Sequence, residues 1–318
     1  GLPATVAADG PQGIKATYAG NNSTVAYTSE PVMAATFNTE ILYNVGLSMG
    51  EDALRSDNRV VGWYGPAMNI HRTPYSGRNF EYYAEDPFIA GTICAAEVQG
   101  IQSKGVYVYL KHVALNDSET SRRGVNTWLN EQAAREVYLK AFQAPVEVGN
   151  ANGVMIAYTR WGAVWSGGNY GLVTGILRNE WGCDGMVITD NVLTQYVNGP
   201  DGVLAGVSIY DAMMSFVTDT LPKYKNDPVI VTAMREACHH NLYAIANSCG
   251  MNGVGANTTI KVTRPTVVTM SIIIACASTF FCLLGIVMWI IGGIKFRKTE
   301  EYKAYKDFKK SLKAAKKA

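Results

Sequence analysis

Four apolar segments of this sequence are each followed at once by side chains that can do chemistry. Segments 4–8, 106–110, 154–157 and 186–189 lead into Asp9, Lys111 with His112, Tyr158, and Asp190, in that order. These residues offer two carboxylates, two nitrogen donors and a phenol, which together can hydrogen-bond many hydroxyl groups of one ligand. Asp190 alone could be a helix N-cap. Four such positions favour a binding site for a polyhydroxylated molecule.

The elements that must position these residues alternate between strands and helices. Apolar runs predict strands at 4–8, 60–64, 106–110, 154–157 and 186–189, and helical patterns occupy 39–55, 90–103, 129–147 and 170–180. Continuous apolar strands separated by helices are typical of a parallel sheet covered on both faces. Residues 1–255 contain no G-x-G-x-x-G turn and have the length of a (β/α)8 barrel, which we favour over a doubly wound sheet. The carboxyl ends of barrel strands form the rim where active sites lie.

Charge is distributed unevenly along the chain. The 318 residues carry a formal net charge of +2, but residues 295–318 hold ten Lys and Arg against three acids. This leaves 18 of the 28 basic residues against 23 of the 26 acidic ones in the body, a net charge of −5. An acidic body argues against nucleic acid as a partner, since the basic surface is confined to the tail.

Residues 267–294 form an apolar segment without a charged side chain. A helix needs about 20 such residues to cross the hydrocarbon layer, so this segment is predicted to be one C-terminal transmembrane helix after a linker at 256–266. The positive-inside rule places the basic tail, 295–318, in the cytoplasm and the barrel outside the cell membrane. Apolar residues recur in the tail every three or four positions, which predicts an amphipathic helix on anionic membrane lipid or a solvated tail.

The histidines and cysteines form no pattern of metal ligands. His71, His112, His239 and His240 have no H-E-x-x-H spacing, and the six cysteines form no C-x-x-C pair. We therefore expect no metal and no cofactor, and the cysteines do not indicate a disulfide framework.

The chain also resembles glycoside hydrolase family 3, of the β-glucosidase type. The matching stretches occur in the family's order and are ADGPQGI (8–14), GPAMNIHRTPYSGRNFEYYAEDP (65–87), KHVALNDSET (111–120), REVYLKAFQAPV (135–146), VMIAYTR (154–160) and LRNEWGCDGMVITD (177–190). The GRNFEYY block followed by EDP is the most specific of them. The resemblance covers nearly all of 1–255 and implies a (β/α)8 barrel that hydrolyses glycosides.

The resemblance implies a role for each matched site residue. Asp190 corresponds to the catalytic nucleophile, which forms a covalent glycosyl-enzyme. The other positions bind or line the terminal sugar: Asp9 the far hydroxyls, Arg78, Lys111 and His112 the middle hydroxyls, and Met155 and Tyr158 the wall of the same subsite. Neighbouring cations are expected to keep Asp190 ionised at neutral pH.

Retention of configuration requires a second carboxyl about 5–5.5 Å from the nucleophile. The resemblance implies that this acid/base residue comes from an α/β sandwich domain packed on the barrel. The sequence of residues 256–318 does not have the pattern of strands and helices expected of such a domain. We therefore expect a sandwich domain N-terminal to Gly1, and a barrel truncated at its N-terminus.

The function that these features favour is a membrane-anchored exo-β-glucosidase that releases terminal glucose from a β-linked oligosaccharide or glucoside. The D-G-P element at Asp9 favours a hexose, while β-xylosidase or β-galactosidase specificity stays open. Four positions depart from the family pattern, namely Lys15, Thr159, Asn191 and Ser208. These departures and the missing acid/base residue leave an alternative, a barrel that binds cell-surface glycans without cleaving them.

Overall fold

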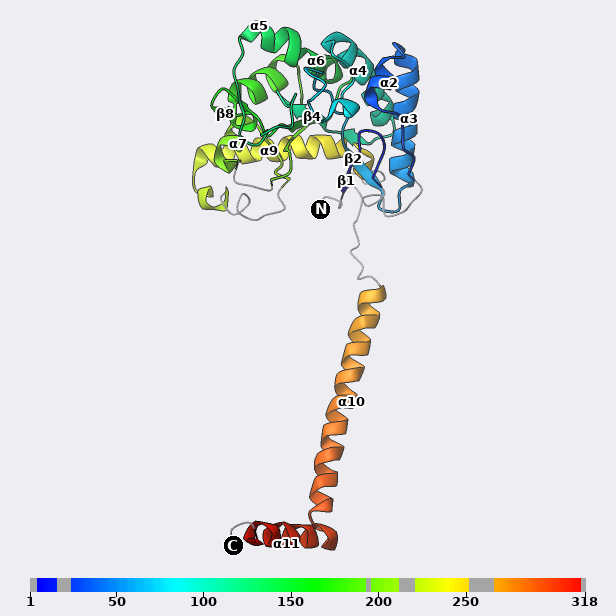
Figure 1. The fold of residues 1–318 in the computed structure, drawn as a ribbon, viewed down its shortest axis with the longest axis vertical. Coiled ribbons are helices and arrows are strands. Elements are labelled where there is room, and N and C mark those ends of the chain that lie inside the picture. The colour runs from blue at the N-terminus through cyan, green and yellow to red at the C-terminus, as the bar shows by residue number, and fades with distance from the viewer. Residues whose placement is uncertain (1–4, 16–23, 193–195, 212–220, 252–265, 316–318) are drawn as a thin grey trace. The chain divides into compact units, whose positions relative to one another are not determined.

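A computed structural model describes residues 5–15, 24–192, 196–211, 221–251 and 266–315. The chain divides into two compact units, Gly1–Ala256 and Asn257–Ala318. In the first unit helices surround short parallel strands, and the second unit consists of two helices (Figure 1).

The first parallel sheet has the order β1 (Val6–Asp9), β2 (Val60–Tyr64), β3 (Tyr107–Val108). β2 and β3 are largely buried, as expected of apolar strands covered on both faces. Asp9 is the last residue of β1 and pairs in register with Tyr64 at the end of β2. The strand predicted at 60–64 is confirmed at both bounds. The strand predicted at 4–8 is found at Val6–Asp9, so Asp9 is its last residue and does not follow it as predicted, while residue 4 lies outside the described residues.

The second parallel sheet has the order β4 (Leu110–Val113), β6 (Gly153–Ile156), β9 (Met186–Thr189), and all its residues are buried. β4 includes Lys111 and His112, so these two residues lie within a strand and not after one as predicted. The apolar pattern ends at 110 because both side chains are polar, although they are only 4% and 2% exposed in the fold.

Further bridges extend the parallel arrangement. Ala67 bridges to Lys111 of β4, and Ile209 bridges in parallel to Ile188 of β9. Within the described residues no pairing joins Ile209 back to β1, so the predicted closed eight-stranded barrel is present only in part. The physical reason is that residues 221–251 carry helical and not strand patterns, and they fold as helices.

Helices α3 (Thr39–Arg55) and α4 (Pro87–Ser103) pack against each other and contact β2 and β3, respectively. The helix predicted at 39–55 is confirmed at both bounds. α4 begins three residues before the predicted position, because Asp86 caps the helix and proline suits its first turn. The two helices can approach closely because residue 46 is glycine: a Cβ on Gly46 would lie 2.2 Å from a carbonyl oxygen of α4.

The helices predicted at 129–147 and 170–180 are less regular than expected. The first is divided into α5 (Glu131–Ala133), η2 (Ala134–Tyr138) and α6 (Lys140–Glu147), and the second is η4 (Gly171–Glu180). Both η2 and η4 have π-helical hydrogen bonding. A pattern search at 3.6 residues per turn does not detect the wider π turn.

Further elements, most of them short, connect these strands and helices. They are α2 (Glu30–Ala34), η1 (Asn79–Glu81), β5 (Asn126–Thr127), β7 (Arg160–Trp161), β8 (Val164–Trp165), η3 (Ser166–Gly168), α7 (Gly199–Ala205), η5 (Leu221–Tyr224), α9 (Pro228–Ala246) and η6 (Cys249–Met251). Strands β5, β7 and β8 form a small sheet of their own. Helix α9 contacts both β9 and α7.

The second unit contains α10 (Thr266–Phe296) and α11 (Glu300–Ala315). α10 contains the apolar segment and is long and apolar enough, on length and composition, to cross a membrane. α11 lies in the basic tail. The predicted linker at 256–266 lies outside the described residues except for its last residue.

Candidate active site

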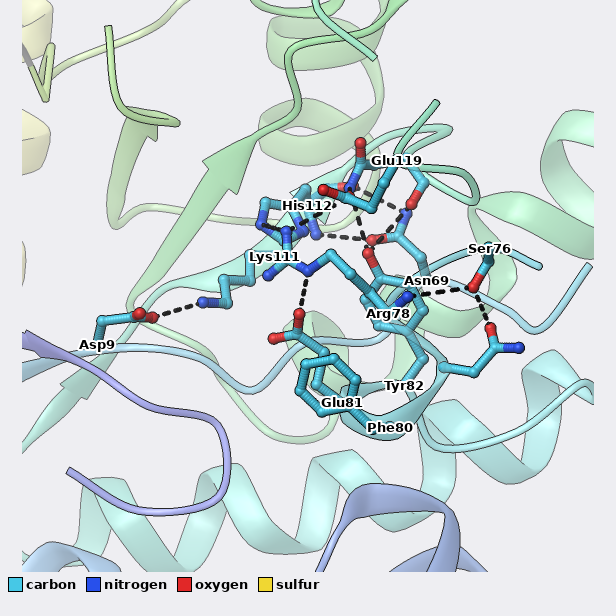
Figure 2. A network of polar contacts seen from close by, with 12 residues as sticks. Asp9, Asn69, Ser76, Arg78, Phe80, Glu81, Tyr82, Lys111, His112 and Glu119 are labelled. Carbon is cyan, nitrogen blue, oxygen red and sulfur yellow. Dashed lines mark hydrogen bonds and ion pairs between the residues drawn. The ribbon is translucent and has the colours of Figure 1, made fainter. Parts of the chain in front are cut away.

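The carboxylate of Asp9 and the ammonium group of Lys111 form an ion pair that joins β1 to β4. Lys111 Nζ lies 2.8 Å from Asp9 Oδ1, and Lys15 contacts the other carboxylate oxygen. Burial raises the pKa of Asp9, but the charges and hydrogen bonds of Lys111 and Lys15 reverse this and lower it to about 2. Figure 2 shows Lys111 reaching toward Asp9. Such a pair can accept a hydrogen bond from one sugar hydroxyl and donate to another.

Arg78 lies between two carboxylates and an imidazole. Its side chain pairs with Glu81 and, at 3.7 Å, with Glu119, and its Nη1 lies 3.1 Å from His112 Nε2 (Figure 2). Because a guanidinium has only donors, Nε2 must accept and the imidazole proton must lie on Nδ1. Burial, followed by the charge of Arg78, lowers the pKa of His112 well below its usual value, so the ring is neutral. Nδ1 is buried without a hydrogen-bond partner among the described residues.

Asn69 holds the backbone at His112 in place. Its Nδ2 donates to the His112 carbonyl at 3.1 Å, and its Oδ1 accepts from the His112 amide at 2.9 Å. Asn69 lies on the segment after β2, so it ties that segment to β4. Sequence reasoning had not singled out Asn69, because its role depends on a partner 43 positions away.

Asp190 directly follows β9 and lies where β6 and β9 end. Its amide donates to the Ile156 carbonyl at 3.0 Å, and its Oδ1 accepts from the Asn191 amide at 2.7 Å. Its Oδ2 lies 3.7 Å from His112 Nε2 and 3.6 Å from Arg122 Nη1. Neither contact is a hydrogen bond, and Oδ2 has no other partner among the residues described. One oxygen of Asp190 is therefore fixed by a hydrogen bond, and the other lies near His112 and Arg122 without one.

Burial decides the direction in which the pKa of Asp190 moves. Burial raises this pKa, while the Asn191 amide and the charges of Arg122, Lys111 and Arg78 lower it, and the net shift is upward. The cations act in the predicted direction but do not outweigh the loss of hydration. The neutral state of His112 contributes to this result, because an imidazolium at the same place would lower the pKa of Asp190 further.

Arg122 belongs to the site and was not predicted. Its guanidinium carbon lies 4.5 Å from the centre of the Tyr158 ring, and its Nε lies 3.2 Å from Glu119. The Tyr158 hydroxyl in turn donates to the Asn191 carbonyl at 2.6 Å. Arg122 lies in the loop between β4 and β5, so a search for polar residues after apolar strands could not find it.

The predicted site residues fall into two groups in the structure. Direct contacts or shared strands connect six of them around the ends of the strands: Asp9, Arg78, Lys111, His112, Tyr158 and Asp190. Met155 lies deeper, paired in register with Ile188 of β9 and packed in an apolar cluster with Tyr109 and Met186. Since Ile188 precedes Asp190 by two residues on the same face of the strand, Met155 lies one layer below Asp190.

Comparison with known proteins identifies the family that has this fold. The family model for the glycosyl hydrolase family 3 N-terminal domain matches residues 1–203. The chain belongs to glycosyl hydrolase family 3. Among curated family 3 relatives, β-glucosidase A of Butyrivibrio fibrisolvens is 41% identical over 190 residues, which are 60% of this chain and 23% of the relative. A β-glucosidase of Ruminococcus albus is 40% identical over 194 residues, 60% of this chain and 20% of the relative. The chain thus spans less than a quarter of the length of these two relatives.

Solved family 3 structures share the fold. β-Glucosidase 3B from Thermotoga neapolitana, in complex with α-D-glucose, superposes with a TM-score of 0.71 and 34% identity, covering 78% of this chain and 36% of that chain. A family 3 β-glucosidase of Bifidobacterium adolescentis superposes with a TM-score of 0.73 and 29% identity, covering 82% and 38%. The fold of the first unit is therefore the TIM-like barrel of the family 3 N-terminal domain, with sheets that are not closed within the described residues.

Proposed function

We propose that this family 3 chain supplies the nucleophile and the sugar-binding residues of a retaining exo-β-glucosidase. The observation that carries the proposal is the state of Asp190. Its Oδ1 is fixed by the Asn191 amide, whereas its buried Oδ2 has no hydrogen-bond partner among the described residues. A carboxylate oxygen that is held in position and left open suits attack on an electrophilic carbon.

In the first step, a lone pair of Asp190 Oδ2 forms a bond to the anomeric carbon from the face opposite the aglycone. The bond between this carbon and the glycosidic oxygen breaks, and that oxygen receives a proton from a general acid. In the second step, the same group, now a base, takes a proton from water, and the resulting hydroxide attacks the anomeric carbon. The ester to Asp190 breaks, the carboxylate is restored, and glucose leaves with its β configuration retained.

The remaining site residues bind the sugar during both steps. Asp9 accepts from the far hydroxyls, and Lys111 beside it donates to their neighbours. His112 donates through its unpartnered Nδ1–H, while Arg78 keeps the ring in the tautomer that allows this. Arg122 on the Tyr158 ring contributes positive charge next to Asp190, which favours its ionised form.

The general acid is proposed to come from an α/β sandwich domain of a longer protein. This view is supported by the relatives, because the part of B. fibrisolvens β-glucosidase A that aligns with this chain is 23% of that protein. Retaining glycosidases need two carboxyl groups about 5–5.5 Å apart, and a domain packed on the strand ends is well placed to supply the second.

We also propose that α10 anchors the enzyme in the cell membrane with the barrel outside. Its uncharged apolar segment supports a single span, and the basic residues that follow support a cytoplasmic tail. In α11 the exposed apolar residues Tyr305, Phe308 and Leu312 alternate with lysines, which suits a helix lying on anionic lipid.

The decisive experiment labels the nucleophile. The probe 2,4-dinitrophenyl 2-deoxy-2-fluoro-β-D-glucoside has a leaving group that needs little protonation, so the first step does not depend on the general acid. The fluorine slows both steps and the leaving group speeds only the first, so the glycosyl-enzyme accumulates. Mass spectrometry of the digested full chain should place one label on Asp190. A label on another carboxylate, or no label, would refute the proposed function.

A further inference from the structure

The segment that carries Asp211 runs beside β9 as the next parallel strand position. Ile209 donates from its amide to the Val187 carbonyl at 3.1 Å, and the Thr189 amide donates to the Ile209 carbonyl at 3.0 Å. These two bonds, with the bridge between Ile188 and Ile209, set the register of the segment against β9.

The same register brings Asp211 beside Asp190. Side chains two positions apart on a strand share a face, so Asp190 shares the face of Ile188, and Asp211 shares the face of Ile209. The backbone of Asp211 is held at this place from both sides of Asp190. Its amide donates to Thr189 Oγ1 at 3.0 Å, and its carbonyl accepts from the Val192 amide at 2.8 Å.

The electrostatics of the site agree with this placement. Burial, and then the charge of Asp190, raise the pKa of Asp211. Tyr196 lies close to both carboxylates: its hydroxyl donates to the Asp190 carbonyl at 2.8 Å, and after burial the charges of Asp190 and Asp211 contribute to raising its pKa. Asp211 is therefore a second carboxyl group next to the proposed nucleophile, on an adjacent strand.

The position of Asp211 determines which sugar hydroxyl it can reach. A glucopyranose with its anomeric carbon at Asp190 Oδ2 extends in two directions, through C2 with its hydroxyl and through the ring oxygen to C5 with its hydroxymethyl group. His112, with Arg78 against it, lies on the β4 side of Asp190, across β6. These donors suit the C2 and C3 hydroxyls. Asp211 lies on the opposite side of β9, which is the side where a sugar bound in this orientation would place its ring oxygen and hydroxymethyl group.

We propose that Asp211 forms a hydrogen bond to the 6-hydroxyl of the glycone and so selects hexoses over pentoses. The inference rests on the proposed function, since it assumes a pyranose at Asp190. It adds the residue that distinguishes hexose from pentose substrates. The distinction matters in this family, because a relative from Bifidobacterium longum that is 37% identical over 199 residues is an exo-α-(1→6)-L-arabinopyranosidase, named for a pentose. A pentopyranose has no hydroxymethyl group at C5 and nothing for Asp211 to bind.

The test compares a hexoside with the matching pentoside in the full chain. The substrates are 2,4-dinitrophenyl β-D-glucoside and 2,4-dinitrophenyl β-D-xyloside, which share a leaving group that needs little acid catalysis. Asp211→Ala should lower kcat/KM for the glucoside by about tenfold or more, because the 6-hydroxyl loses the carboxylate that accepts its hydrogen bond. The value for the xyloside should change less than about threefold, since the lost contact does not exist there. The control is Tyr210→Phe on the same segment, whose hydroxyl bonds instead to the Gly199 carbonyl, and it should leave the ratio unchanged.

Equilibrium binding gives the same comparison without turnover. Titration calorimetry of the full chain in detergent should show that Asp211→Ala weakens binding of D-glucose by about tenfold and leaves that of D-xylose within about twofold. An equal loss for both sugars, or no loss for glucose, would overturn the assignment of Asp211. Labelling of Asp190 by the 2-deoxy-2-fluoro-β-D-xyloside in Asp211→Ala shows that the nucleophile is intact. Absence of labelling in the unaltered chain would instead count against the proposed function itself.

Discussion

His112 Nε2 lies 3.7 Å from Asp190 Oδ2, but the imidazole is neutral and its Nε2 already accepts from Arg78. The two residues therefore face each other without an ion pair. Asp190 gains no imidazolium partner, so burial keeps its pKa raised. The ring instead keeps an N–H on Nδ1 for a ligand. This relationship is consistent with the proposed roles, in which His112 binds the sugar and Asp190 reacts with it.

Replacement of the nucleophile should abolish turnover without closing the site. Asp190→Asn keeps the shape of the side chain, but the amide cannot form a glycosyl ester. On 2,4-dinitrophenyl β-D-glucoside we expect kcat to fall by more than about 10⁴-fold, or about 5 kcal/mol of transition-state stabilisation. Binding of glucose, measured by calorimetry, should change by less than about tenfold. Substantial activity in this variant would assign the chemistry to another residue.

The pH profile should report the raised pKa of Asp190. Only the carboxylate attacks, so kcat/KM is lost as the pH falls through a pKa that lies above 3.8, the usual value for an aspartate. Arg122 lowers this pKa, so Arg122→Gln should move the acid limb to higher pH. Arg123→Gln is the matched control, because Arg123 also lies over the Tyr158 ring but is not among the main charges that act on Asp190. Equal shifts of the acid limb in both variants would show that stacking on the Tyr158 ring, and not the charge near Asp190, controls the pH profile.

The ion pair between Asp9 and Lys111 should contribute to stability above pH 4. The pKa of Asp9 in the folded state is about 2, below its usual 3.8, so its contribution is present above pH 4 and is lost as the pH falls toward 2. Lys111→Met should lower the free energy of unfolding at pH 7 by about 2 kcal/mol, since it removes the buried one of the two lysines that pair with the Asp9 carboxylate and leaves only the exposed Lys15. Urea unfolding at pH 3, 5 and 7 measures this. If the double variant loses as much free energy of unfolding as Lys111→Met and Asp9→Asn lose together, the two residues are not coupled.

Glu30 should make the protein less stable at alkaline pH. Burial, and then the charge of Glu97, raise the pKa of Glu30 from 4.5 to about 9. The folded state therefore binds this proton more tightly than the unfolded state, and stability falls as the pH rises between these values. From pH 6 to 8 this one proton should lower the free energy of unfolding by about 2.7 kcal/mol, and Glu30→Gln should remove this part of the slope. Parallel slopes for both proteins would mean that Glu30 titrates normally.

The membrane anchor can be tested by phase partition. The full chain should enter the detergent phase of Triton X-114, because α10 exposes a continuous apolar surface. Phe281→Asp combined with Leu284→Asp should shift the protein to the aqueous phase, since each charge costs about 2.5–3.5 kcal/mol at the centre of a span. The apolar control, Phe281→Leu with Leu284→Ile, should stay in the detergent. Aqueous recovery of the unaltered chain would refute the anchor.

The sequence by itself determined several elements and two of the residues at strand ends, although the strand predicted at 106–110 is divided into β3 and β4 and the one predicted at 154–157 is found at Gly153–Ile156. β2, β9 and α3 have the predicted bounds, and Asp9 and Asp190 lie where apolar runs stop. These features are local: a buried strand needs consecutive apolar side chains, and a parallel sheet places all its carboxyl ends at one edge. The apolar segment within α10 can be predicted from the sequence for the same reason, because the hydrocarbon layer constrains one continuous stretch of chain.

Only the tertiary structure decided how the site is completed and charged. Arg122 and Asp211 reach Asp190 from a loop and from a neighbouring strand position, and no periodicity marks either of them. Lys111 and His112 lie inside β4 because a polar side chain can occupy a buried strand when its partners come from distant segments. The direction of the Asp190 pKa was likewise hidden, because it depends on how much water the surrounding chain removes and on whether His112 is charged. Both quantities are sums over atoms far apart in the sequence, and only folding brings those atoms together.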